Sequence, residues 1–569
     1  MSTTLPPDIS TLLAQIEATR DIDRLRGLSD GFAQADTATV AAVLTEAARF
    51  CATHLLPLNP VADRNGCRLD DGRVTTPPGH GPAWQAYIDA GWSTLDHPAE
   101  LGGQGLPLFL AASVQQIVDS SCAAFGMLPV LQRSAARLLA SFGSEWMKSE
   151  WLPKLVRGEW GATICISEAD AGSDVARLRT IARANADGSW SITGEKMWIS
   201  FGDHDLTPRI GHCLLARTEV GLSLFLVPSD ITDAAGVVMR NAIMVRRIEE
   251  KMGLHGSPTC ALGFEGATGW LIGIEGRGLQ QLFVMITNMR LSAGVQGVGL
   301  ATAAVDVAFA YAAERRQGGI PSAPPVAINE HADVQRQLLG MIARVEMLRG
   351  VGLAIAVQAD IAAHDPDADV CKQADALIQW LLPIFKTSGG ECGFDVASDA
   401  IQVLGGAGYT REWPVEQAAR DARIATIYEG TTGIQALDLV HRRLWRDGGD
   451  GLSAFLKVAR ADLASCRDEN CDQAARCYDL LENAADWLMG MRGDVRGAEA
   501  GATAFLHLAA LAATGWIATR LAGLTDDTSA SRRLAAAGRY WLCDLADRAA
   551  PLRAETVRGA APLALFAQL

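Results

Sequence analysis

The chain has 569 residues, of which 49% are hydrophobic and 20% charged, and its formal net charge is −15 at pH 7. The length is too great for a single core, and the composition excludes a disordered chain. The charge argues against nucleic acid as the main partner, because phosphate binding needs clustered Lys and Arg, whereas 65 acidic residues here outnumber 50 basic ones.

The twelve cysteines are scattered along the chain, with no Cys-x-x-Cys pair and no zinc-ligand spacing. They predict reduced, mostly buried thiols, no metal site and a cytoplasmic location. The first residues, MSTTLPPDIS, lack the basic start and apolar run of a signal peptide. Residues 502–524 approach the length of a membrane span, but His507 and Arg520 favour a buried bundle helix, with membrane-surface association as the weaker alternative.

Residues 1–158 are predicted to be mostly helical; the segment TATVAAVLTEAARFC, for example, has a Thr start and an apolar stripe. From about residue 160 the pattern alternates, and Asp187-Gly188 between two alternating runs predicts a hairpin. No helix of about ten residues interrupts this stretch. An antiparallel β unit is therefore favoured over a parallel Rossmann sheet.

Helical periodicity returns after residue 276, where five apolar residues from Val334 to Leu348 share one helix face. In the last part of the chain we expect helices at 452–466, 472–490, 497–522 and 529–548. The predicted fold class is α+β, mainly α. Its four domains are an N-terminal helical domain (1–158), an antiparallel β domain (159–275), a helical bundle (276–445) and an extra C-terminal helical domain (446–569).

The segment 401–436 carries the strongest chemical signal. An apolar helix ends in Gly405, Gly406 and Gly408, where a backbone without Cβ atoms can approach a ligand. Glu429 then lies beside Tyr428 on a glycine-bounded loop. A carboxylate on such a loop can point into an apolar cavity, which would raise its pKa and suit it to act as a general base. Composition alone favours the alternative of a loop glutamate in solvent.

Two weaker segments precede it. ICISEADAGSDV (164–175) couples a strand to a turn whose Ser167 and Ser173 could hold a pyrophosphate or a flavin edge, although an ordinary loop has the same composition. In MWISFG (197–202), Trp198 could face a cofactor or belong to the core.

Together, in this order, these segments resemble the acyl-CoA dehydrogenase family. ISEADAGSD is similar to its flavin-edge signature, MWIS to its flavin-contacting strand, ERRQGG (314–319) and QVLGGAGY (402–409) to its two further cofactor motifs, and IYEGTTGIQ (427–435) to its catalytic-base loop. The likeness spans about residues 40–445, and the C-terminal helices resemble a longer subgroup of the family.

The resemblance implies an FAD-dependent oxidoreductase that introduces an α,β double bond into an acyl-CoA thioester. Glu429 would take the α-proton while the β-carbon passes hydride to flavin N5, and the Glu429 N–H would polarise the thioester oxygen. The implied substrate is 3-(methylthio)propanoyl-CoA or a related short- or medium-chain acyl-CoA. The implied acceptor is an electron-transfer flavoprotein, and shared FAD binding implies a homo-oligomer, a dimer or larger.

The resemblance also assigns roles to individual residues. The expected cofactor contacts are Ile166, Ser167, Ser173, Trp198, Ser200, Arg315, Gln402, Gly406 and Thr431. Arg315, Gln402 and Gly406 would reach FAD from a neighbouring subunit. The expected substrate contacts are Arg290, Tyr428 and Gly430.

Three positions depart from the family pattern. Ala169 stands in place of a usual proline, Gly318 in place of an adenine-stacking Phe, and Gly433 in place of a frequent Gln. The alternative functions are an acyl-CoA oxidase, which would share every residue named here, and a non-catalytic or DNA-associated member of the family. The many Asp and Glu residues of 446–569 argue against DNA binding.

Overall fold

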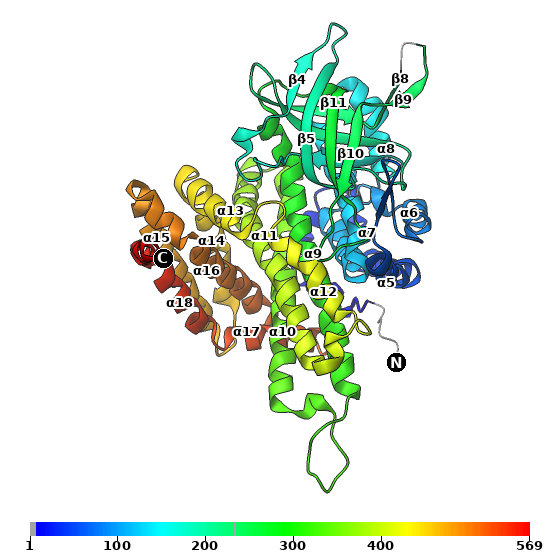
Figure 1. The fold of residues 1–569 in the computed structure, drawn as a ribbon. Coiled ribbons are helices and arrows are strands. Elements are labelled where there is room, and N and C mark those ends of the chain that lie inside the picture. The colour runs from blue at the N-terminus through cyan, green and yellow to red at the C-terminus, as the bar shows by residue number, and fades with distance from the viewer. Residues whose placement is uncertain (1–6, 233–234) are drawn as a thin grey trace. The chain divides into compact units, whose positions relative to one another are not determined.

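The structure is a computed structural model that describes residues 7–232 and 235–569, shown in Figure 1. The chain divides into two compact units. Unit 1 contains Met1–Cys51, Pro107–Ser120 and Arg290–Leu569, and unit 2 contains Ala52–Leu106 and Ser121–Met289. Two long helices contribute residues to both units: α7 (Leu108–Phe142), whose backbone leaves helical geometry at Cys122, and α9 (Gly278–Glu314).

Unit 2 is built around a seven-stranded sheet in the order β10-β11-β5-β4-β6-β3. The seventh strand, β7, pairs with both β11 and β6, so β5, β4, β6, β7 and β11 form a closed ring of pairings. The sheet strands are β3 (Gly161–Cys165), β4 (Ile181–Ala184), β5 (Trp190–Ser200), β6 (Ile210–Arg217), β7 (Leu222–Pro228), β10 (Ile243–Ile248) and β11 (Thr259–Ile272).

The predicted hairpin at Asp187-Gly188 is confirmed: β4 and β5 pair antiparallel across it, and Gly188 has φ +84°. Most pairings are antiparallel, as expected, but β3 and β4 each run parallel to β6. This arrangement was not predicted, because the chain reaches β6 only after the β4–β5 hairpin, and the sequence does not show which earlier strands β6 pairs with. Alternating inward side chains such as Ile192, Leu214 and Phe264 form the core of the sheet.

Apart from the sheet and its parts of α7 and α9, unit 2 consists of short helices and two small strand pairs. They are η1 (Cys51–Leu55), α5 (Leu56–Asn65), β1 (Arg68–Asp70), β2 (Arg73–Thr75), α6 (His80–Asp89), η2 (Trp92–Thr94), η3 (Ala99–Leu101), η4 (Met147–Trp151), α8 (Leu152–Val156), η5 (Val175–Arg177), β8 (Asp230–Thr232) and β9 (Val238–Arg240). Cys51, the first residue of η1, belongs to unit 1.

Unit 1 is helical, and its longest members after α9 are the packed pair α10 (Ala332–His364) and α11 (Ala368–Leu404) (Figure 1). The predicted helix face is confirmed, since Leu338, Ile342, Val345 and Leu348 are buried. The shorter elements are α1 (Ser10–Glu17), α2 (Ile22–Arg26), α3 (Asp30–Ala33), α4 (Thr37–Phe50), η6 (Ile328–Glu330), η7 (Gly405–Tyr409), α12 (Val415–Ala422), η8 (Arg423–Thr426), α13 (Thr432–Leu437) and η9 (Asp438–Arg446).

The C-terminal helices of unit 1 follow the expected order with one difference. They are α14 (Asp450–Ser465), α15 (Cys471–Gly490), η10 (Met491–Gly493), α16 (Val495–Leu521), α17 (Ser529–Leu542), α18 (Leu545–Arg558) and η11 (Ala561–Gln568). The helix expected over 529–548 ends at Leu542, and a separate helix starts at Leu545. No glycine or proline marks this break, so the sequence pattern did not show it.

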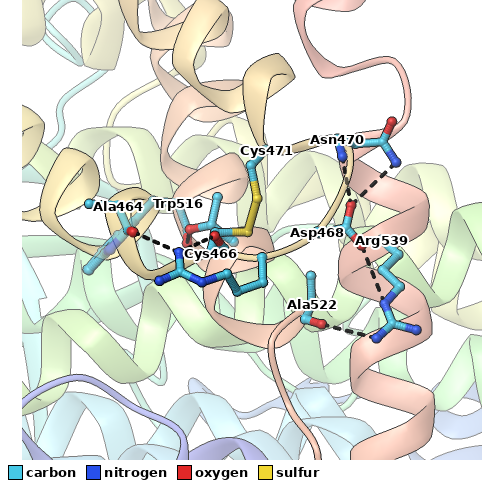
Figure 2. The surroundings of a disulfide bond; sticks show 10 residues. Ala464, Cys466, Asp468, Asn470, Cys471, Trp516, Ala522 and Arg539 are labelled. Carbon is cyan, nitrogen blue, oxygen red and sulfur yellow. Dashed lines mark hydrogen bonds and ion pairs between the residues drawn. A yellow bond between two sulfur atoms is a disulfide. The ribbon is translucent and has the colours of Figure 1, made fainter.

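The expectation that the cysteines are thiols is wrong at one pair. Cys466 and Cys471 form a disulfide, with their Cα atoms 6.4 Å apart, in the loop between α14 and α15 (Figure 2). Within this loop Asp468 accepts hydrogen bonds from Asn470 and lies 3.5 Å from the Nε atom of Arg539 on α17. The ends of two helices bring the sulfurs together, a geometry that cysteine spacing alone does not reveal.

Within residues 7–232 and 235–569, three helices are long and apolar enough, by length and composition, to cross a membrane: α7, α9 and α16. In their most apolar windows 89%, 72% and 72% of the residues, respectively, are buried inside the structure. The segment 502–524 falls mostly on α16, which is packed against α13, α17 and α18. The expectation of a buried bundle helix is therefore confirmed.

Candidate active site

Glu429 lies on a tight loop between η8 and α13. Its backbone has φ +55°, and the following Gly430 has φ +91°. A non-glycine residue in this left-handed region costs about 1–2 kcal/mol, so surrounding contacts must hold the loop. A Cβ atom at Gly430 would lie 2.7 Å from Nε2 of Gln435, which explains why glycine follows the glutamate.

Two fully buried side chains supply those contacts. Gln435 Nε2 donates a hydrogen bond to the Glu429 carbonyl at 2.9 Å and approaches the Gly430 carbonyl at 3.4 Å. Lys386, on α11, donates from Nζ to the same Gly430 carbonyl at 2.7 Å. Both side chains are 0% exposed. The loop that carries Glu429 is thus held at the carbonyl oxygens of two successive residues, Glu429 and Gly430.

The surroundings of Glu429 make its carboxyl group a stronger base than an ordinary one. Burial raises the pKa of Glu429, and the cations of Lys386 and Arg290 oppose that rise without cancelling it. Burial in turn lowers the pKa of Lys386 to about 8. A carboxylate with a raised pKa holds an abstracted proton more tightly, which is what a general base requires.

Arg290, on α9, is buried and donates from Nη1 to Oδ2 of Asp438 at 2.7 Å. Asp438 is also buried and lies 3.6 Å from Nε of Arg442 and 3.8 Å from Nη2 of Arg443. Arg290 is therefore a buried ion-pair partner that acts electrostatically on Glu429, and not a charge on a helix surface. Its contact with the CoA chain stays a prediction.

Tyr428 and Thr431 flank the base on the same loop. The Tyr428 hydroxyl donates to Oε1 of Gln296 at 3.0 Å, and burial raises the pKa of Tyr428, so the phenol is neutral. The Thr431 hydroxyl accepts a hydrogen bond from the Ile434 N–H at 3.4 Å and caps α13. The loop residues Tyr428, Glu429, Gly430 and Thr431 are consequently ordered by defined partners.

A second cluster lies in unit 2, where β5 carries a bulge. Lys196 faces Leu262 and Ile199 faces Cys260, so Met197 and Trp198 together oppose Ala261 alone. The bulge gives Trp198 a φ of +64° and turns its indole outward, 58% exposed. The alternative that Trp198 belongs to the core is wrong. An exposed, strained aromatic residue of this kind is typical of a binding surface.

The segment 166–168 lies beside this bulge. The Met197 N–H donates to the Ser167 carbonyl at 3.0 Å. Lys196, 1% exposed, donates from Nζ to the Ile166 carbonyl at 2.9 Å and to Glu168 Oε1 at 2.8 Å. The structure thus brings Ile166, Ser167 and Trp198 together on neighbouring backbone segments.

Ser200 ends the same strand, opposite Thr259, whereas Ser173 is exposed on the loop after β3. Ile166, Ser167 and Ser200 are half-buried. Hydroxyl groups and an exposed indole on one strand surface offer the polar and stacking contacts that a flavin ring needs.

Arg315, Gln402 and Gly406 lie elsewhere in unit 1, at the ends of α9 and α11, and all three are exposed. The rings of Tyr311 and Trp413 pack edge to face at 5.1 Å, which links the end of α9 to the chain that follows η7. Arg315 donates from Nη2 to Oε1 of Gln317 at 3.2 Å, a contact outside the loop of Glu429. The expectation placed them at a neighbouring subunit's cofactor, and it stays a prediction.

Sequence reasoning missed Lys386, Gln435 and Asp438. The signal for Lys386 was a single lysine inside the apolar run LLPIFKTSGG of a long helix, where an unpaired charge is unusual. Gln435 and Asp438 carry no comparable signal, since short amphipathic helices commonly contain Gln and Asp.

Comparison with known proteins identifies the class. The family models of the acyl-CoA dehydrogenase N-terminal, middle and C-terminal domains match residues 37–159, 163–267 and 276–444. The 3-methylmercaptopropionyl-CoA dehydrogenase of Ruegeria pomeroyi is 38% identical over 494 residues, covering 84% of both chains. The chain belongs to the acyl-CoA dehydrogenase family, and it is an FAD-dependent acyl-CoA dehydrogenase.

Two further proteins show how far the likeness extends. The broad-specificity linear acyl-CoA dehydrogenase FadE5 of Mycobacterium tuberculosis is 33% identical over 462 residues, covering 76% of this chain and 74% of its own length. An acyl-CoA dehydrogenase from Bacillus anthracis, solved with FAD, has 19% identity and a TM-score of 0.77, covering 97% of this chain and 92% of its own. This structure shows that the fold, including the C-terminal helices, is shared.

Proposed function

We propose that Glu429 is the general base that takes the α-proton of the acyl-CoA thioester. The observation that carries the proposal is the constrained loop: a glutamate with left-handed backbone, bounded by a required glycine and held through its backbone by Lys386 and Gln435. Such conformational strain is maintained where a side chain must be presented in one orientation.

The electrostatics suit the same role. Burial raises the pKa of Glu429, so its carboxylate binds the α-proton more strongly than a solvent-exposed glutamate would. The cations of Lys386 and Arg290 limit that rise and so keep the carboxylate form available. The two effects together give Glu429 a raised pKa while its carboxylate form can still be populated.

The backbone of the base residue suits activation of the thioester. Within the residues that the structure describes, the Glu429 N–H donates no hydrogen bond. This N–H is available to the thioester oxygen, where negative charge develops as the α-proton leaves. One residue would then supply both the base and a donor that acidifies the proton it removes.

FAD, when bound, supplies the hydride acceptor for the β-carbon. The residues of this chain that would hold it are Trp198, with its exposed indole, together with Ile166, Ser167, Ser173 and Ser200, and Thr431 beside the base. Arg315, Gln402 and Gly406 are exposed, which suits contact with the FAD of a second copy in a homodimer or larger oligomer.

The substrate we propose is 3-(methylthio)propanoyl-CoA or a related short- or medium-chain acyl-CoA. Its support is the identity of 38% to a dehydrogenase named for 3-methylmercaptopropionyl-CoA. We propose an electron-transfer flavoprotein as the acceptor and a cytoplasmic location. The support for the acceptor is the family's chemistry, and the support for the location is the ten cysteines that carry no disulfide among the described residues.

A panel of acyl-CoA thioesters tests this function. Each is mixed anaerobically with the holoenzyme, and loss of flavin absorbance is followed over a range of pH. We expect the short- and medium-chain thioesters to bleach the flavin, with a rate that falls on the acid side as Glu429 becomes protonated. No bleaching by any thioester would refute the function. Rapid oxygen consumption without an added acceptor would identify an oxidase instead.

A further inference from the structure

Lys386 is an unusual residue for the middle of a long apolar helix. It lies on α11 between the buried residues Phe385 and Thr387, and it is itself 0% exposed. A lysine ammonium is costly to bury, because it loses its hydration, unless partners replace the water. The partners that the structure gives Lys386 therefore indicate what the residue is for.

The hydrogen bond and the ring contact of Lys386 both lead to the loop that carries the base. Nζ donates to the Gly430 carbonyl at 2.7 Å and lies 5.8 Å from the centre of the Tyr428 ring, a cation–π distance. Its charge interacts with the carboxyl group of Glu429, and each group shifts the other's pKa. Lys386 thus touches the residues before and after the base and acts electrostatically on the base itself.

The loop needs such an anchor. Glu429 occupies the left-handed region of the backbone, which a free chain avoids, and the next peptide bond turns through Gly430 at φ +91°. Gln435 holds the Glu429 carbonyl from the adjacent helix α13. Lys386 lies on α11, 44 residues before Gly430 in the chain. Its hydrogen bond therefore ties the base loop to a distant helix of the bundle and not only to the adjacent helix.

We propose that Lys386 is a positioning residue for proton abstraction: its buried ammonium anchors the Gly430 carbonyl to α11 and interacts with the Glu429 carboxylate. The proposal rests on Glu429 being the base. The anchor fixes the direction in which the carboxylate points, and the charge favours the deprotonated form that accepts the α-proton. These two effects are separable, because hydrogen bonding survives in a neutral donor and charge does not.

Three charged side chains also shift the pKa of Lys386. Arg290 on α9 opposes its protonation, whereas Glu429 on the base loop and Glu391 on α11 favour it. Burial dominates these effects and lowers the pKa of Lys386 to about 8. The anchor is therefore cationic at neutral pH and loses its charge on the alkaline side, so its effect on Glu429 weakens as the pH rises above about 8.

The test compares three variants as purified holoenzymes. Lys386→Met removes both the charge and the hydrogen bond, and Lys386→Gln removes the charge but keeps a donor. Lys372→Met, on the same helix, replaces an exposed lysine and is the matched control. FAD content, the Kd for the enoyl-CoA product and the rate of anaerobic flavin reduction are measured from acid to alkaline pH.

We expect both Lys386 variants to shift the acid limb of the rate profile to higher pH, because the carboxylate of Glu429 loses a stabilising cation. Lys386→Met should in addition lower the maximal rate by about 10- to 100-fold with FAD retained, because a misdirected base reacts slowly. Lys386→Gln should keep more of the maximal rate. Lys372→Met should behave as the unsubstituted chain.

An unchanged acid limb and an unchanged maximal rate in FAD-loaded Lys386→Met would overturn the proposal. Loss of the folded holoenzyme in both Lys386 variants would also overturn it, since Lys386 would then serve folding alone. Glu429→Gln in the same assay separates this failure from that of the proposed function. If the flavin of Glu429→Gln is still reduced, the base is wrongly assigned. If Glu429→Gln is inactive but the Lys386 variants behave as the unsubstituted chain, only the positioning role fails.

Discussion

The described part of unit 2 buries four histidines that carry no charge at neutral pH. His80, His204 and His212 are each at most 1% exposed, and His97 is 4% exposed. Burial lowers the pKa values of His80 and His97 to about 4 and those of His204 and His212 to about 3. Among the described residues neither ring nitrogen of His80 has a hydrogen-bond partner. Acid should therefore destabilise this unit, because unfolding releases the rings to water, where they bind protons.

The size of the effect follows from the shifts. Above about pH 6.5 the rings are neutral in both states and contribute no pH dependence. Below it only the unfolded chain gains protons, so each histidine lowers the free energy of unfolding by about 1.4 kcal/mol per pH unit. Between about pH 7.5 and about pH 5.5 the four together should remove about 5 kcal/mol, a large part of a typical domain's stability of roughly 5–15 kcal/mol.

Urea unfolding of the protein at the two pH values measures this loss. His80→Leu should remove about a quarter of the pH-dependent difference, because one of four neutral rings is gone. His54→Gln, at an exposed histidine, should leave it unchanged. A difference below about 1 kcal/mol between the two pH values would refute the reasoning, since the four rings would then not be kept neutral by burial.

Three variants probe other features. Gly430→Ala should destabilise the base loop by about 1–3 kcal/mol and slow flavin reduction at least about 10-fold, measured by denaturant unfolding and stopped-flow absorbance; an unaltered rate would show that the left-handed turn is dispensable. Asp438→Asn should cost about 3–5 kcal/mol, seen as a lower Tm, because Arg290 is left buried without its anion; an unchanged Tm would contradict a buried pair. Replacing Cys466 and Cys471 by serine should lower the free energy of unfolding by about 2 kcal/mol, and equal stability with and without reductant would argue against the disulfide.

Much of the fold follows from periodicity. The hairpin at Asp187-Gly188 and the helix face from Leu338 to Leu348 were both predicted, because turn chemistry and side-chain spacing are local properties. The parallel pairing of β3 and β6 and the break before Leu545 depend on partners distant in the chain or on packing, and no local pattern records them.

In the candidate site, too, residues marked by a local pattern were predicted and residues that depend on distant partners were not. Glu429 and its glycine were found because the loop has a recognisable composition. Lys386 was missed because its partner lies 44 residues further along the chain. The exposure of Trp198 arises from a bulge against β11, and the register of that pairing is set more than about 60 residues later, so the sequence could not decide between core and surface.

The most direct measurement compares the rate of flavin reduction in two variants, Glu429→Gln and Glu412→Gln. The second replaces an exposed glutamate earlier in the chain and is the control. Both holoenzymes are mixed anaerobically with a thioester that bleaches the unsubstituted enzyme, after their FAD content and fold have been checked. We expect Glu429→Gln to keep FAD but to reduce it about 100- to 10,000-fold more slowly, because an amide cannot take the α-proton, while Glu412→Gln is unaffected. Bleaching of Glu429→Gln at an undiminished rate would contradict the assignment of Glu429 as the base.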